Sequence, residues 1–176
     1  PQTPSTALTG IDVQVVRHAG GGLELHYFAQ GDVEAVKWPA PCASARADGL
    51  WETTCFEAFV QPQGRASYIE FNFAPSTLWA AYRFTGERAG MQLAHGLSAP
   101  VFRTRETART HVLHVRLGLD AMPGLPVEAE WRLGLSAVIE ALDGSKSYWA
   151  LRHPAPKPDF HNPQGFALKL AAPEAA

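Results

Sequence analysis

The sequence predicts an all-β protein, built as an antiparallel sandwich of two sheets. Alternation of apolar and polar residues with period two recurs along the chain, and no stretch of ten or more residues has a clean helical period. The 14 prolines and 15 glycines are spread evenly, as in a protein of many short strands joined by turns. Strands without helical crossovers cannot form a parallel sheet, so we expect about ten or eleven antiparallel strands in a sandwich or barrel.

The expected strands follow the alternation and end at turn residues. The length of 176 residues fits a single domain covering 1–176, with segments 1–10 and 171–176 peripheral. A helical turn is expected at 119–123, and a loop rich in Pro, Ala and Gly at 39–49. The expected strands are 11–17, 23–28, 33–38, 54–60, 68–73, 78–84, 101–104, 110–117, 127–139, 148–151 and 166–170.

Composition excludes several classes of function. The net charge is −2 and Lys and Arg form no runs, whereas a nucleic-acid binder needs a basic surface to neutralise phosphates. No apolar stretch approaches the roughly 20 residues that span a bilayer. The first residues lack the features of a secretory signal, so we expect a cytoplasmic protein. Cys42 and Cys55 are too few for a disulfide framework, and we expect both to be reduced, with Cys55 packed in a strand. The oligomeric state stays open.

Motifs of known catalytic chemistry are not found. The sequence contains no Gly-x-Ser-x-Gly, no His-Glu-x-x-His and no dinucleotide-binding fingerprint, and we expect no cofactor. His111 and His114 are three residues apart on one strand, so their side chains point to opposite faces and cannot chelate one ion.

A polar set on three consecutive strands is the strongest candidate site. Alternation places Glu70 and Asn72 on one face of the strand 68–73. Pairing across the 61–67 loop brings Glu57 roughly opposite Glu70, and two opposed carboxylates repel. A turn at 74–76 would bring Arg83 to the same rung, where its guanidinium would separate the two carboxylates. Three interpretations fit this set: a structural ion-pair network, a patch that binds a ligand, and a carboxylate pair for hydrolysis.

Aromatic residues and a proline-rich loop surround this set in the sequence. Trp51 precedes the Glu57 strand, and Trp149 precedes the loop 152–162; each either stacks on a ligand or caps the sandwich. Trp131 belongs to an apolar strand face and is expected in the core. In the loop, prolines reduce the entropy lost on ordering, and His153, Asp159 and His161 are candidate ligand contacts. A two-His-one-carboxylate metal site from these three is the less favoured alternative.

The residues 51–84 contain Trp-Glu-Thr-Thr-Cys-Phe-Glu, Tyr-x-Glu-Phe-Asn and Ala-Ala-Tyr-Arg-Phe. With Tyr-Trp-Ala-Leu at 148–151 and Lys-Pro-Asp-Phe-His at 157–161, they resemble DOMON-like domains related to family 9 carbohydrate-binding modules. The resemblance implies an immunoglobulin-like or jelly-roll sandwich in which two tryptophans enclose a terminal sugar. Trp51, Glu57 and Arg83 match the first aromatic, the glutamate and the arginine of that pattern, and Trp149 is a candidate for the second tryptophan.

Other DOMON domains bind haem through a Met and a His. Here Met91 is the one methionine near the motifs, and no His is obviously placed to join it. The sequence therefore favours a non-catalytic module that binds a carbohydrate or a related polar metabolite. The alternatives are a glycoside-acting enzyme using Glu57 and Glu70, a haem-binding domain, and a purely structural or interaction domain.

Overall fold

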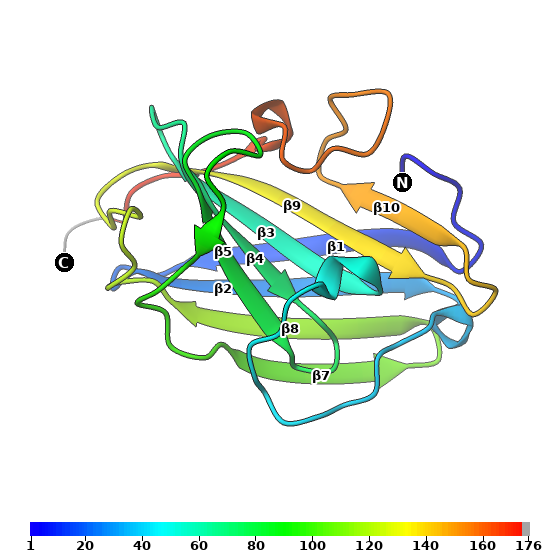
Figure 1. Cartoon of the computed structure of the whole chain (residues 1–176). Coiled ribbons are helices and arrows are strands. Elements are labelled where there is room, and N and C mark those ends of the chain that lie inside the picture. Colours follow the sequence, from blue (N-terminus) through cyan, green and yellow to red (C-terminus); the bar gives the residue numbers. More distant parts are fainter. Residues whose placement is uncertain (174–176) are drawn as a thin grey trace.

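Two antiparallel β-sheets face each other across a shared core (Figure 1). The computed structural model describes residues 1–173, and in that range it contains eleven strands and three short 3-10 helices. One sheet has four strands in the order β1-β2-β8-β7, and the other has seven, in the order β10-β9-β3-β4-β5-β6 with β11 also paired to β9. The strands are β1 (Leu8–Arg17), β2 (Gly22–Gly31), β3 (Cys55–Pro62), β4 (Tyr68–Phe73), β5 (Trp79–Phe84), β6 (Gln92–Leu93), β7 (Val101–Thr107), β8 (Thr110–Gly118), β9 (Trp131–Glu140), β10 (Lys146–Ala150) and β11 (Leu168–Leu170); the 3-10 helices are η1 (Val33–Ala35), η2 (Leu50–Glu52) and η3 (Pro163–Gly165).

The core lies between the two sheets. Alternate residues of most strands enter one cluster of buried apolar side chains, including Phe56 and Phe71 from the large sheet and Leu25 from the small one. Trp131 is fully buried there, and the Arg17 guanidinium lies 3.6 Å from its ring centroid. Tyr27 links the sheets through its hydroxyl, which donates to the Glu57 carbonyl at 3.1 Å. This bond fixes β3 against the small sheet.

The outer face of the seven-stranded sheet is also covered. All residues of β3 and β4 are buried, and so are all but Arg83 in β5, although alternate ones point away from the core. A second apolar cluster forms on this face, where Phe59, Tyr68, Tyr82 and Phe84 pack with residues of the covering loops such as Phe166. Gly134 of β9 leaves space for Phe166, because a Cβ at that position would lie 2.5 Å from Phe166 Cδ1. The covering loops thus shape the polar face of the sheet.

The predicted all-β sandwich is confirmed, and residues 1–173 include no α-helix. None of the elements in that range is a helix long and apolar enough to cross a membrane. Cys55 is buried as expected, Cys42 is exposed, and neither forms a disulfide. Of the segment 171–176 expected to be peripheral, residues 174–176 lie outside the described range.

Several expected elements differ from those observed: the strand expected at 101–104 continues to Thr107, and β6 has no counterpart among the expected strands. Residues 33–38 do not form a strand: η1 and a single bridge from Val36 to Ala141 carry the chain from the small sheet to the large one. The strand expected at 127–139 begins only at Trp131, since residues before it form turns. At the other end of the chain, β1 begins at Leu8, which is buried, so the segment 1–10 is partly in the sheet and not wholly peripheral.

Candidate functional site

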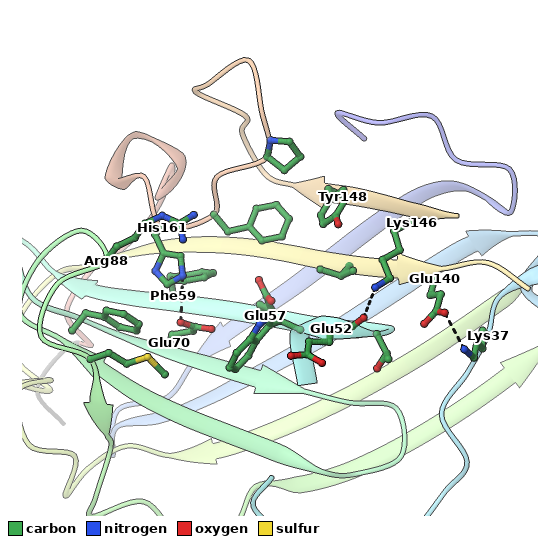
Figure 2. A pocket seen from close by; sticks show the side chains of 17 residues that line it. Lys37, Glu52, Glu57, Phe59, Glu70, Arg88, Glu140, Lys146, Tyr148 and His161 are labelled. Atoms are coloured by element: carbon green, nitrogen blue, oxygen red, sulfur yellow. Dashed lines mark hydrogen bonds and ion pairs between the residues drawn. The ribbon is translucent and has the colours of Figure 1, made fainter. Parts of the chain in front are cut away.

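A cavity of about 870 Å³ opens on the outer face of the seven-stranded sheet (Figure 2). Its floor comes from β3, β4, β9 and β10, and its walls come from η2, the 85–91 loop and the 151–162 loop. This volume falls within the roughly 300–1,000 Å³ of small-molecule sites. The lining residues are Lys37, Trp51, Glu52, Thr53, Glu57, Phe59, Glu70, Phe84, Arg88, Met91, Val138, Glu140, Lys146, Tyr148, Pro158, Phe160 and His161.

Glu57 lies in the middle of the labelled residues (Figure 2) and is 3% exposed. Its Oε2 accepts a hydrogen bond from Ser136 Oγ of the neighbouring strand β9 at 2.8 Å. Burial, followed by the charge of Glu70, raises the pKa of Glu57 to about 8, although the hydrogen bond from Ser136 lowers it. At neutral pH this carboxyl is therefore protonated, and it can both donate and accept a hydrogen bond.

Glu70 lies on the adjacent strand at one end of the cavity, beside Arg88 and His161 (Figure 2). Burial raises its pKa, while a hydrogen bond from Asn72 and the nearby charge of Arg88 lower it. Asn72 Nδ2 donates to Glu70 Oε1 at 2.7 Å. Asn72 thereby holds one carboxylate oxygen and leaves the other turned toward His161 Nε2, 3.7 Å away.

A chain of hydrogen bonds orients His161. The Arg88 backbone N–H donates to the Tyr68 hydroxyl at 3.3 Å, and that hydroxyl lies 2.8 Å from His161 Nδ1. Burial, followed by the charge of Arg88, lowers the pKa of His161 to about 4, so the ring is neutral at pH 7. A neutral ring that accepts at Nδ1 carries its proton on Nε2, facing Glu70 across a gap longer than a hydrogen bond.

The opposite end of the cavity holds a second charged group. Lys37 Nζ contacts Glu140 Oε1 at 2.9 Å, and Lys146 Nζ donates to the Glu52 carbonyl at 2.6 Å. Figure 2 shows both contacts at the far side of Glu57 from His161. These groups give the cavity polar contacts at both ends.

Trp51 lines the cavity as the middle residue of η2 and is 38% exposed. Gly49 begins this turn with a φ of 72°, a left-handed conformation that favours glycine. The Trp51 ring packs edge-on against Tyr82, with 5.8 Å between the centroids. The Tyr82 hydroxyl donates to Asp48 at 2.6 Å, which ties η2 to the sheet. The Trp51 ring is therefore exposed on a turn, η2, that is fixed to the sheet.

The expected position of Arg83 is wrong. The β4–β5 pairing sets Glu70 opposite Tyr82 and Ile69 opposite Arg83, so Arg83 is on the other face of the sheet from Glu70. The loop that joins the strands has five residues, 74–78, and it shifts the expected register by one. Arg83 is exposed and approaches Gly124. The cation near Glu70 is instead Arg88, from the following loop.

Glu57 pairs with Asn72, and Glu70 pairs with Phe59, so the two glutamates share a face but are displaced by two residues from the expected rung. Trp149 points the other way: it is 9% exposed, packs with the core and lines a separate cavity of about 320 Å³. Tyr148, its neighbour, lines the first cavity instead. Trp149 therefore cannot be the second stacking ring of this site.

The three candidate residues of the 152–162 loop differ in whether they face the cavity. His161 lines the cavity, whereas Asp159 pairs with Arg88 at 2.6 Å and does not line it. His153 is half-buried with its ring 6.5 Å from that of Phe160. Among residues 1–173, these three do not come together as metal ligands. Asp159 and His153 instead position the loop, and His161 is the one of the three that faces the cavity.

Sequence reasoning missed the polar residues supplied from distant segments, Lys37, Arg88, Ser136, Glu140 and Lys146. Glu140 and Ser136 alternate with the core residues of β9 and were identifiable as one polar face. Lys37 and Arg88 come from irregular segments, whose position no periodicity indicates.

No protein-family model and no curated protein sequence matches the chain. The structure is similar to a crystal structure of a "putative carbohydrate-binding protein" from Bacteroides uniformis, with a TM-score of 0.63. The match covers 90% of this chain and 85% of the other, at 15% sequence identity. At that identity the similarity shows a shared fold.

Proposed function

We propose that the cavity on the outer face of the seven-stranded sheet binds a carbohydrate or a related polar metabolite, and that the protein is a binding module. The observation that carries the proposal is one open cavity that combines aromatic rings with the buried carboxyl groups of Glu57 and Glu70. Aromatic rings stack on the apolar faces of sugars, and polar side chains take the hydroxyl groups. The resemblance to family 9 carbohydrate-binding modules and the fold shared with the Bacteroides protein support the same ligand class.

Each group has a part in this proposal. Trp51 supplies the exposed stacking ring, with Tyr148 and Phe160 as the aromatic residues contributed from other elements. Glu57, protonated at neutral pH, both donates to and accepts from a hydroxyl group. His161 Nε2 and Glu70 Oε2 are 3.7 Å apart and can share a second hydroxyl. Asn72 and Asp159 position Glu70 and Arg88, and His153 supports the loop.

A thermal-shift screen of mono- and oligosaccharides, followed by calorimetric titration of each hit, tests the proposal. A ligand that binds only the folded state must raise the melting temperature. We expect a hit whose affinity falls at least tenfold in Trp51→Ala while the fold is kept. Arg83→Met is the matched control, because Arg83 is on the other face of the same sheet. Equal loss in both variants would overturn the placement of the site, and the absence of any saccharide hit would overturn carbohydrate as the ligand.

A glycoside-acting enzyme is the second candidate, and one observation favours it. The raised pKa of Glu57 is the property required of a general acid, and Glu70 offers a second carboxyl on the same face. Turnover of aryl glycosides that disappears in Glu57→Gln would establish hydrolysis. If the unaltered protein binds a glycoside without hydrolysing it, the enzyme is excluded and the binding module is kept.

A further inference from the structure

The outer face of the four-stranded sheet carries a cluster of Glu24, His26 and His114, on the opposite side of the sandwich from the cavity. His26 and His114 are direct cross-strand partners on β2 and β8. Glu24 precedes His26 by two residues, so the sheet pleat places its side chain on the same face. One ligand atom from each of the three residues lies within 4.8 Å of the others.

The nitrogen atoms of both histidines converge on one carboxylate oxygen. The distance to Glu24 Oε2 is 3.9 Å from His26 Nε2 and 3.8 Å from His114 Nε2. Both exceed the length of a hydrogen bond, and His114 Nε2 is buried with no partner. With metal–ligand bonds of about 2.0–2.2 Å, tetrahedral coordination separates ligand atoms by about 3.4 Å. To hold one ion, the carboxylate oxygen would have to move a few tenths of an ångström closer to the nitrogens, and the two stacked rings would have to turn so that both nitrogen lone pairs point at the ion.

The surrounding groups hold the carboxylate in this orientation. Glu24 Oε1 is 3.3 Å from His18 Nε2 and 3.5 Å from Arg116 Nε. These contacts occupy the oxygen that faces away, so Oε2 remains turned toward the two histidines. The His26 and His114 rings stack with 4.0 Å between centroids and an interplanar angle of 17°.

We propose that Glu24, His26 and His114 form a binding site for a divalent transition-metal ion of the zinc type. Two imidazole nitrogens and one carboxylate oxygen are a donor set that suits Zn²⁺ and its neighbours, whereas Mg²⁺ and Ca²⁺ prefer oxygen ligands. Arg116, and Arg103 opposite His114 on β7, are cations beside the site and work against binding. The single carboxylate charge and two nitrogen donors favour an ion that binds nitrogen strongly.

An ion at this site would join two neighbouring strands. It would bind the folded sheet only, because Glu24 and His26 meet His114 through the β2–β8 pairing. Binding therefore stabilises the fold by mass action. The site lies on the other sheet from the proposed sugar cavity, so either proposal can fail without the other.

Calorimetric titration and thermal unfolding of tag-free protein, treated with chelator and then dialysed, test the site with ZnCl₂. We expect one equivalent of Zn²⁺ to bind and to raise the melting temperature, with no comparable effect of CaCl₂ or MgCl₂. His114→Asn and Glu24→Gln should each weaken Zn²⁺ binding at least tenfold. His95→Asn, which changes an exposed histidine outside this sheet, should leave it unchanged.

Nitrogen NMR of the imidazole groups supplies a readout that does not depend on variants. Zn²⁺ should shift the Nε2 resonances of His26 and His114 and leave those of His95 in place. If His114→Asn fails to fold, these resonances and Glu24→Gln decide the question. Absence of Zn²⁺ binding, equal binding by all variants, or shifts confined to other histidines would overturn the proposal.

Discussion

Burial of the Glu57 carboxyl makes its protonation part of the folding equilibrium. Folding raises its pKa from 4.5 to about 8, so the folded state holds this proton more tightly than the unfolded chain does. The resulting stabilisation is complete below pH 4.5, declines as the pH rises between these values, and is lost above about pH 8. The contribution of Glu57 to the free energy of unfolding should therefore fall as the pH rises from 4.5 to about 8.

Glu57→Gln should flatten this dependence. Gln keeps the shape and hydrogen-bonding capacity of a protonated carboxyl but takes up no charge. Urea unfolding at a series of pH values measures the effect. Glu34→Gln, at an exposed position in η1, is the control and should retain the slope of the unaltered protein. If Glu57→Gln leaves the pH dependence of the free energy of unfolding unchanged, groups other than Glu57 cause that dependence.

The candidate site was predictable from the sequence only in part. Period-two alternation put Glu57, Glu70 and Asn72 on one face correctly, because a register error of two residues keeps the face. The error for Arg83 was a single residue, and that reverses the face. Trp149 is predicted at the site, but the residue that lines the cavity is its neighbour Tyr148, because adjacent strand residues point to opposite faces.

At the scale of the element, β9 and the 151–167 segment depend on each other. Gly134 admits the Phe166 ring, and Phe166 holds the end of the loop that carries Phe160 and His161. Gly134→Ala should displace that ring and destabilise the fold by about 1–3 kcal/mol, as overpacking does. The loosened loop should then be cut faster by trypsin after Arg152, because Lys157 is followed by Pro158 and trypsin does not cleave that bond.

Gly10→Ala is the matched control for limited proteolysis. Gly10 also lies in a strand, but a Cβ there meets nothing within 4 Å. Its cleavage rate should equal that of the unaltered protein. Unchanged cleavage in Gly134→Ala would show that Phe166 does not hold the loop.

Element positions were predictable where strands alternate and turns are short, as at 68–73, which matches β4. They were not predictable where a segment changes sheet. Residues 33–38 carry apolar side chains in a strand-like pattern. The backbone of Val36 and Lys37, however, pairs with the end of β9 and the turn after it, and these tertiary contacts carry the segment from one sheet to the other. The loops that cover the large sheet show no periodic alternation of apolar and polar residues, so their positions were not predictable.

For the molecule as a whole, the two sheets share one apolar cluster. Neither sheet can separate without exposing the side chains of both, so we expect a single cooperative unfolding transition. Differential scanning calorimetry tests this by comparing calorimetric and van't Hoff enthalpies, which should agree. Two resolved transitions would indicate that the sheets unfold independently.

The order of the small sheet leaves β7 at its edge, with one side of its backbone free for pairing. A free edge is a template for addition of a strand from another molecule, which is how soluble β proteins begin to aggregate. In β7 this edge presents the exposed arginines Arg103 and Arg105. Two copies that approached edge to edge with these arginines aligned would bring like charges together, which opposes self-association along this strand.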